Sequence, residues 1–174
     1  MIQELVKKLQ QKNRKAQQVF YENYSKKMFL IILRYINDAD VAKNITNQSF
    51  YKIFTHIGNF IYSNDNGFNG WVKKIAINEA LVYLRSNKNI RLTDEYQEID
   101  NHSPFNPDNE LQAQDYYNLI RELPDGYRII FNMFAIEGYS HKEIAEELNI
   151  SESTSRSQLT HARAMLRKKI EKFF

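Results

Sequence analysis

The chain has 174 residues, of which 43% are hydrophobic, and this is enough to build one ordinary domain or two small ones. It contains no cysteine, which excludes disulfides, thiolate catalysis and cysteine-based zinc sites. The formal charge is +3, no apolar run approaches the roughly 20 residues that span a bilayer, and residues 1–17 lack the apolar stretch of a signal peptide, so a soluble cytoplasmic protein is expected.

Residues 1–90 are predicted to form one all-helical domain. The three prolines of the chain lie at 104, 107 and 124, so none interrupts this half. Apolar residues spaced by three and four predict helices over 2–9, 16–36, 40–57 and 68–85, and residues 62–67 have the composition of a loop. The apolar faces of these helices include Val19, Phe20, Ile32, Ile45, Phe50, Phe54, Trp71, Val72 and Leu81.

Residues 91–110 are predicted to be a linker, and the charge of the chain is segregated around them. Residues 92–125 hold 9 Asp/Glu and 1 Lys/Arg, a balance of −8, whereas residues 1–91 carry +9 and residues 126–174 carry +2. Ordinary solubilising charge is the alternative explanation of a basic excess, but the separation of charge favours nucleic acid as a partner. Two basic blocks around an acidic connector favour two modules that bind polyanions. A further hypothesis is that the acidic linker folds against the basic blocks and masks them.

Residues 111–174 are predicted to form a second helical domain that contains a helix-turn-helix. One helix is expected over 111–123, and another begins at Pro124 and closes at Gly138. The segment Ser140-His-Lys-Glu143 fits a capping box ahead of a short helix. Asn149 suits the left-handed conformation that ends this helix, and Ser151 can cap the next one.

The last helix of this motif is expected to bury one face and to present the other to DNA. Ser155, Leu159, Ala162 and Leu166 are predicted to point inward. An ordinary helical hairpin with a solvated face is the alternative, but no acid occurs between residues 153 and 163. Arg and Gln can make forked contacts to base edges, and Ser and Thr can contact phosphates or bases. The candidate DNA-binding residues are Thr154, Arg156, Ser157, Gln158, Thr160, His161 and Arg163.

The same segments resemble a known family. Residues 123–132 (LPDGYRIIFN), 137–148 (EGYSHKEIAEEL) and 150–159 (ISESTSRSQL) are similar to region 4 of the extracytoplasmic-function (ECF) sigma factors, in particular to the branch common in Bacteroidetes. Residues 16–24 and 68–85 resemble region 2 of the same family. The resemblance implies that region 2 binds the clamp of RNA polymerase and opens the −10 element, and that region 4 binds the −35 element. It also implies frequent control by an anti-sigma factor.

The segment that resembles the promoter-melting helix has a composition suited to single-stranded DNA. Lys73 and Lys74 lie near the aromatic Phe68 and Trp71, and such sites combine cations along the backbone with surfaces that accept unstacked bases. The resemblance places Asn78 near a captured base. The DNA-binding candidates of region 2 are therefore Trp71, Lys73, Lys74 and Asn78, although periodicity alone fits Trp71 equally well in a core.

The segment that resembles the polymerase-binding helix departs from the family pattern. Lys43, Asn44, Asn47 and Gln48 stand where acids and a Gln are expected, and Val82 stands where the melting helix usually has Asp. Loss of acids weakens charge pairing with a basic clamp surface. Asn44, Asn47, Gln48 and Phe50 are the candidates for polymerase binding, and Phe50 could equally belong to the core.

The sequence therefore predicts an all-α protein of two small domains, residues 1–90 and 111–174, that acts as a sigma factor. Its expected partners are core RNA polymerase, promoter DNA and an anti-sigma factor. The four His show no metal spacing, and there is no Gly-rich phosphate loop or nucleophile elbow, so neither catalysis nor a cofactor or metal is expected. A helix-turn-helix regulator and a degenerate sigma paralogue with weak polymerase recruitment are the alternatives.

Overall fold

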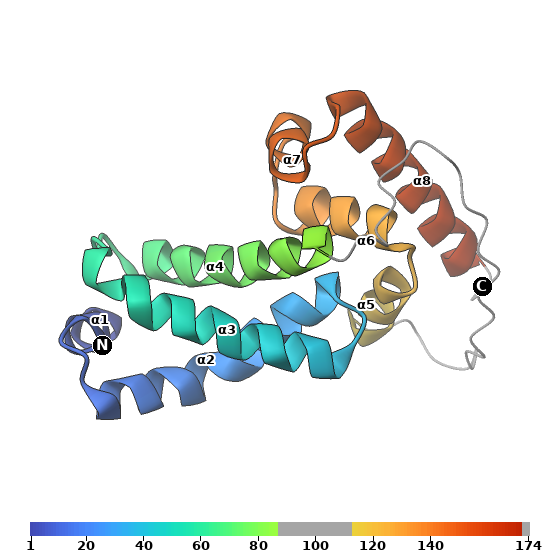
Figure 1. The fold of residues 1–174 in the computed structure, drawn as a ribbon. Coiled ribbons are helices and arrows are strands. Elements are labelled where there is room, and N and C mark those ends of the chain that lie inside the picture. Colours follow the sequence, from blue (N-terminus) through green and yellow to red (C-terminus); the bar gives the residue numbers. More distant parts are fainter. Residues whose placement is uncertain (87–112, 172–174) are drawn as a thin grey trace. The chain divides into compact units, whose positions relative to one another are not determined.

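The computed structural model describes residues 1–86 and 113–171 of the chain, and all of its elements there are helical (Figure 1). The predicted all-α class is thus confirmed. The chain divides into two compact units, Met1–Ser86 and Asn87–Phe174, and each is described by itself. The predicted acidic linker at 91–110 lies outside the described residues. No helix in the described parts of the chain is long and apolar enough to cross a membrane.

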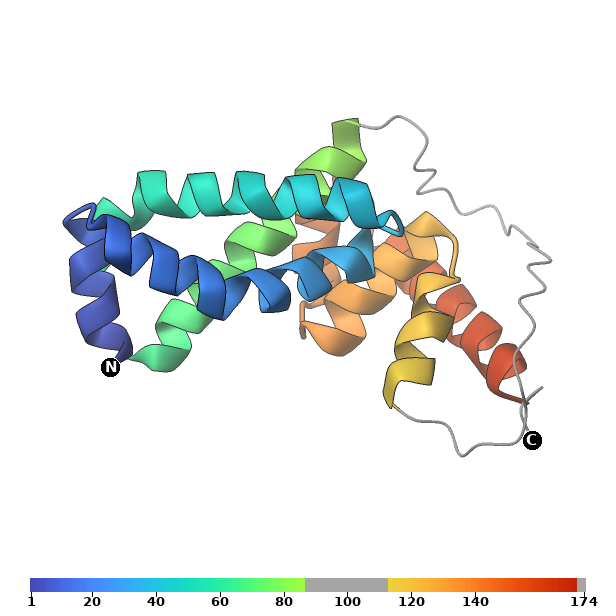
Figure 2. The same cartoon turned by 90° about the horizontal axis from the view of Figure 1, so that it is seen from below.

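Three long helices and one short helix build the first unit. They are α1 (Ile2–Gln10), α2 (Arg14–Tyr35), α3 (Ala39–His56) and α4 (Asp65–Ser86), with a 3-10 turn, η1 (Ile57–Asn59), after α3. Helices α2, α3 and α4 pack against one another, while α1 packs on α2 and η1 (Figure 2). Local caps set the helix starts: the side chain of Asn13 accepts a hydrogen bond from Ala16 N, and that of Asp38 accepts from Val41 N.

Aromatic rings fill the centre of this unit. The Phe20 ring is fully buried, and its centre lies 5.4 Å from that of Phe50 and 5.9 Å from that of Phe68. Offset and edge-on arrangements of this kind stabilise aromatic pairs beyond their apolar area. Helices α2, α3 and α4 thus share one aromatic core.

Two expectations for this half need correction. Val19 was placed on the apolar face of the second helix, but its side chain is 45% exposed because the buried face of α2 runs through Ala16, Phe20 and Met28 instead. Residues 62–67 were expected to be a loop, whereas α4 begins at Asp65. The side chain of Asn64 accepts a hydrogen bond from Gly67 N at 2.8 Å, so the polar run contains a helix cap as well as a loop.

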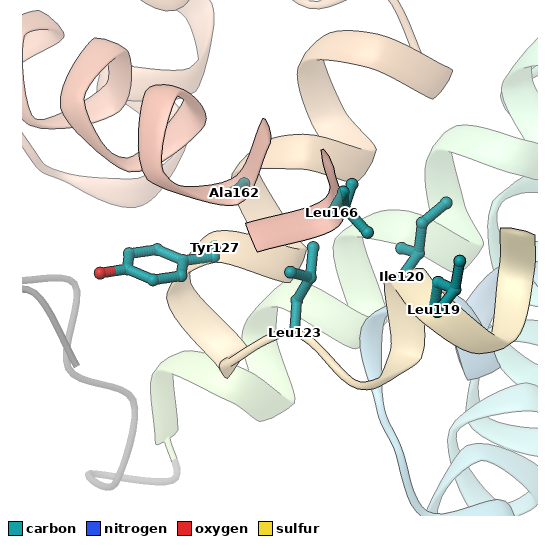
Figure 3. Packing of buried hydrophobic residues seen from close by; sticks show 6 residues of the cluster. All are labelled: Leu119, Ile120, Leu123, Tyr127, Ala162 and Leu166. Carbon is teal, nitrogen blue, oxygen red and sulfur yellow. The ribbon is translucent and has the colours of Figure 1, made fainter. Parts of the chain in front are cut away.

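The described part of the second unit is also helical. It contains α5 (Ala113–Arg121), α6 (Asp125–Phe131) with a π-helical extension η2 (Asn132–Ile136), α7 (His141–Leu148) and α8 (Glu152–Ile170). Gly138, at φ +79°, ends the extension as expected, and Tyr139 N donates to Met133 O. Helices α5, α6 and α8 enclose a cluster of buried side chains (Figure 3), made of Leu119, Ile120, Leu123, Tyr127, Ala162 and Leu166.

A buried arginine fixes the connection between α5 and α6. Arg128 is only 3% exposed, and its guanidinium donates to the carbonyl of Leu123 at 2.8 Å and pairs with the carboxylate of Asp125. The guanidinium thereby satisfies a carbonyl left over at the end of α5, while Asp125 compensates its charge. These contacts fix the start of α6, and α6 in turn packs against α8.

Candidate nucleic-acid interface

Helices α7 and α8 form the predicted helix-turn-helix, and their caps are those expected from the sequence. Glu143 N donates to Ser140 Oγ at 3.2 Å, and Ser140 N donates to Glu143 Oε2 at 2.8 Å, which completes the capping box. Asn149 adopts the left-handed conformation, with φ 53°, at the end of α7. Thr154 N donates to Ser151 Oγ at 3.0 Å and starts α8. Short-range hydrogen bonds therefore fix the turn between the two helices.

The inner face of α8 is wider than the sequence analysis expected. Ser155, Leu159, Ala162 and Leu166 are buried as predicted. Gln158 is also buried, at 2% exposure, and its assignment to the DNA-facing surface is therefore wrong. Gln158 lies three residues after Ser155 and four before Ala162, so helical geometry places it on the same inner face.

The remaining candidates of α8 differ in how far they are exposed. Arg156 and Thr160 are exposed, whereas Thr154 and Ser157 are partly buried. The guanidinium of Arg156 pairs with the carboxylate of Glu152 one turn earlier, at 2.7 Å. An exposed pair of this type contributes little to stability, so Arg156 can exchange Glu152 for a DNA partner at small cost.

Arg163 and His141 both contact the ring of Phe134. The Arg163 guanidinium carbon lies 5.6 Å from the ring centre, which is cation–π range, and the His141 ring stacks on the same phenyl group at 4.5 Å. His141 Nδ1 also lies 2.9 Å from Ser155 Oγ. Burial, together with the charge of Arg156, lowers the pKa of His141 below its ordinary value.

His161 was expected to face outward, but it is partly buried. Its ring stacks on that of Tyr127, with 5.7 Å between the ring centres and an angle of 29°. Tyr127 belongs to the buried cluster of Figure 3, so His161 forms the edge of that cluster and exposes only part of its ring. The His161 side chain is therefore less accessible than the exposed side chain of Arg156.

In the first unit, the four region 2 candidates all lie on α4. Trp71 is partly buried, and its ring centre lies 4.7 Å from that of Phe60 and 6.2 Å from that of Phe68. Lys74 is exposed, while Lys73 and Asn78 are partly buried. Trp71 thus contacts core aromatic rings without being fully buried, so the structure is compatible with both interpretations left open by its spacing.

The polymerase-binding candidates separate into two groups on α3. Asn44, Asn47 and Gln48 are exposed. Phe50 is 3% exposed and packs against Phe20, so its assignment as a contact residue is wrong: its ring belongs to the aromatic core.

Two exposed apolar side chains were missed by the sequence analysis. Tyr51 is 74% exposed and follows Asn47 by one turn of α3. Ile61 is 89% exposed and lies in the segment between η1 and α4. Tyr51 adjoins the core residue Phe50, and only the phase of α3 in the packed unit shows that Tyr51 faces outward, whereas Ile61 lies outside the helices. Within the described residues, no group of His, Asp and Glu side chains is arranged to hold a metal ion.

Comparison with known proteins gives matches for both units. The model of the family "Sigma-70, region 4" matches residues 113–166. The ECF RNA polymerase sigma-E factor of Haemophilus influenzae is 28% identical, over 97% of this chain and 95% of the relative. The RNA polymerase sigma-H factor of Pseudomonas aeruginosa is 27% identical, over 97% and 93% of the two chains. The sigma factor RpoE of Bartonella quintana, solved with the anti-sigma factor NepR, has the same fold, with a TM-score of 0.52, 16% identity and coverage of 88% and 96%.

The helix-turn-helix of the second unit lies almost entirely in the stretch that is similar to the region 4 family, and the two-unit helical fold is that of the Bartonella quintana sigma factor. The similarities, which extend over nearly the whole chain, support its assignment to the ECF family of RNA polymerase sigma factors.

Proposed function

We propose that this chain is a sigma factor that directs promoter-specific initiation of transcription by binding core RNA polymerase and DNA. The observation that carries the proposal is the capped helix-turn-helix of α7 and α8, which lies within the stretch matched by the region 4 family except for the last four residues of α8. The similarity to named sigma factors over 97% of the chain supports the extension to region 2. We expect no catalytic activity of the chain itself.

Each unit has its own part in the proposed mechanism. The exposed face of α8, with Arg156, Thr160 and Arg163, binds duplex DNA upstream, since helix-turn-helix proteins place their second helix in the major groove. Helix α4 and the segment before it hold the opened strand, with Trp71 beside it and Lys74 near its phosphates. Helix α3 contacts the polymerase through Asn44, Asn47 and Gln48.

An anti-sigma factor is a further proposed partner. The structurally similar sigma factor of Bartonella quintana was solved in complex with one, and the resemblance to ECF factors implies the same type of control. Because polymerase and chromosomal DNA are its proposed targets, we place the protein in the cytoplasm.

Reconstituted transcription tests the central proposal. The purified chain is mixed with core polymerase and a genomic promoter library, and co-purification, promoter opening and transcript starts are measured. We expect a stable complex and initiation at a defined set of promoters. Absence of both the complex and promoter opening would overturn the sigma function.

Two other functions share part of the structure and are separated by the same assay. A helix-turn-helix regulator would bind promoter DNA without core polymerase. A degenerate sigma paralogue would recruit polymerase weakly, and the missing acids around residues 43–48 are compatible with this alternative. The regulator has no need for Trp71, Lys73, Lys74 and Asn78 on α4, which favours the sigma function.

Arg156→Ala provides a narrower test of the DNA surface. If Arg156 contacts a base edge, the substitution should cost about 1–3 kcal/mol on the cognate promoter and relax specificity at one position. Binding is measured on the selected promoter and on variants with single base changes. Equal losses on every sequence would instead identify Arg156 as a phosphate contact.

We also propose that the chain belongs to the branch of ECF factors common in Bacteroidetes. The proposal rests on the sequences of residues 123–132, 137–148 and 150–159. A phylogenetic tree of complete ECF sequences tests it, and placement of the chain in a different branch would refute it.

A further inference from the structure

A strongly basic patch lies where α1 passes into α2, away from any residue used above. Residues 7–15 contain five Lys/Arg and no acid. All five side chains are exposed, and Lys8 pairs at 3.2 Å with Glu4, one turn earlier. We call this patch the basic corner, and it consists of Lys7, Lys8, Lys12, Arg14 and Lys15.

The backbone of the basic corner is held in one conformation. Lys12 adopts a left-handed φ of 58°, its N–H donates to Leu9 O at 2.9 Å, and Asn13 N donates to Lys8 O at 3.1 Å. The side chain of Asn13 then caps α2 by accepting from Ala16 N. The cations are therefore presented by an ordered turn and not by a frayed terminus, which reduces the entropy lost when they bind a partner.

A side-chain contact fixes the basic corner beside the segment that enters α4. Gln10 Nε2 donates to Ile57 O at 3.3 Å and to Phe60 O at 2.8 Å. Ile61, the next residue, is 89% exposed, and the centre of the Phe60 ring lies 4.7 Å from that of Trp71. Figure 2 shows α1 at the end of the unit where α3 passes into α4. Cations and partly exposed aromatics thus lie at the same end of one unit.

We propose that the basic corner binds the phosphate backbone of the DNA strand that α4 and its preceding segment hold. The inference rests on the proposed function, because it extends the proposed path of the single-stranded DNA from Trp71 onto α1 and α2. Sites for single-stranded DNA pair aromatic surfaces with cations along the backbone, and this end of the unit supplies both. Residues 1–86 hold 13 Lys/Arg against 6 Asp/Glu, so the field of the whole unit favours a polyanion.

Two matched double variants of the full chain test this inference. Lys7→Gln with Lys15→Gln removes two charges from the basic corner, and Lys26→Gln with Lys27→Gln removes two exposed charges elsewhere on α2. The probe is a fluorescent single strand of mixed sequence, about 20 nucleotides long, whose binding is followed by anisotropy across a salt series. Each phosphate contact contributes about 0.7 to the slope of log affinity against log salt. We expect the corner variant to lower the slope by about 1.4 and the control to change it much less.

Equal slope changes in both variants would mean that only the net charge of the chain matters, and this would overturn the inference. An unchanged slope in the corner variant would also overturn it. A corner variant that loses core polymerase but keeps strand binding would assign the patch to an acidic protein surface, which also overturns it. Thermal melts of both variants verify that the exposed substitutions leave the fold intact. Core polymerase binding by the unmodified chain tests the proposed function separately, so failure of either proposal is distinguishable.

Discussion

The ring of Phe134 contacts side chains from both helices of the helix-turn-helix. It lies in the π-helical extension of α6, and its ring contacts His141 at the start of α7 and Arg163 on α8. A long arginine side chain loses rotamer entropy when it is fixed on DNA, and a contact that restricts it beforehand lowers that loss. We therefore expect Phe134 to act as a positioning residue for Arg163 in the proposed complex with DNA.

Phe134→Leu should weaken DNA binding through Arg163. The variant keeps the apolar character but removes the ring, and an exposed cation–π contact is worth about 0.5–1 kcal/mol, or roughly two- to fivefold in affinity. In a double-mutant cycle, the loss should disappear once Arg163→Gln is present. Phe131→Leu, on the same helical run, is the matched control. Additive losses in the cycle would refute the positioning role.

The pKa of His141 predicts a pH-dependent stability for the second unit. Burial and the nearby Arg156 lower the pKa of this imidazole in the folded state, so the unfolded chain binds the proton more readily. The folded state should therefore lose stability as the pH falls below about 6.5, the ordinary value for histidine. Thermal unfolding between pH 7.5 and pH 5.5 measures this, and His141→Gln should flatten the profile. His56→Gln, in the first unit, should not flatten it.

At the scale of the element, α3 presents an exposed face that carries no charged residue between Asn44 and Tyr51, is flanked by Lys43 and Lys52, and lies beside an aromatic core face. Phe50 and Ile53 are buried, whereas Asn44, Asn47, Gln48 and Tyr51 are exposed. The helix contains no acid after Asp40, and the carboxylate of Glu79, which pairs with Lys52 of α3, is itself largely buried. We therefore expect a partner that binds between Asn44 and Tyr51 to be held by hydrogen bonds and aromatic area more than by charge.

Tyr51→Ala should weaken the complex with core polymerase about tenfold or more, because exposed tyrosines that become buried in an interface are frequent hot spots. Affinity should also depend weakly on ionic strength, since charge attraction is the part of an interaction that salt screens. Titration of labelled core polymerase at several salt concentrations measures both. Thr55→Ala, one turn further along the exposed face, is the control, and an unaffected Tyr51→Ala complex would contradict the assignment.

At the scale of the whole molecule, the acidic stretch at 92–110 lies in the sequence between two parts of the chain that are net basic. The hypothesis of masking predicts that neutralising Asp94, Glu95, Glu98 and Asp100 to their amides raises the affinity of the full chain for a mixed-sequence duplex, most strongly at low salt. Gel-shift titrations provide the measurement. A control that exchanges Asp for Glu, and Glu for Asp, keeps the charge and should leave the affinity unchanged. The same affinity in both variants would refute masking.

Short-range chemistry explains which parts of the fold were predictable. The capping box at Ser140, the left-handed Asn149 and the cap at Ser151 each depend on a few neighbouring residues, and the structure confirms them. The start of α4 was missed because Asn64 can end a loop or cap a helix with the same polar side chain. Composition does not distinguish these two roles.

The sequence by itself determined the helical class and the helix-turn-helix, because helical periodicity and capping are local properties. Only the tertiary structure decided which candidates can touch a partner. Gln158 and Phe50 are buried and Tyr51 is exposed because the rotation of each helix is set by its packing neighbours, and a shift of one residue turns a helix face by about 100°. The same packing places Gln10 against Phe60, and with it the basic corner beside the segment that precedes α4. These residues are 50 positions apart, and no local pattern encodes their proximity.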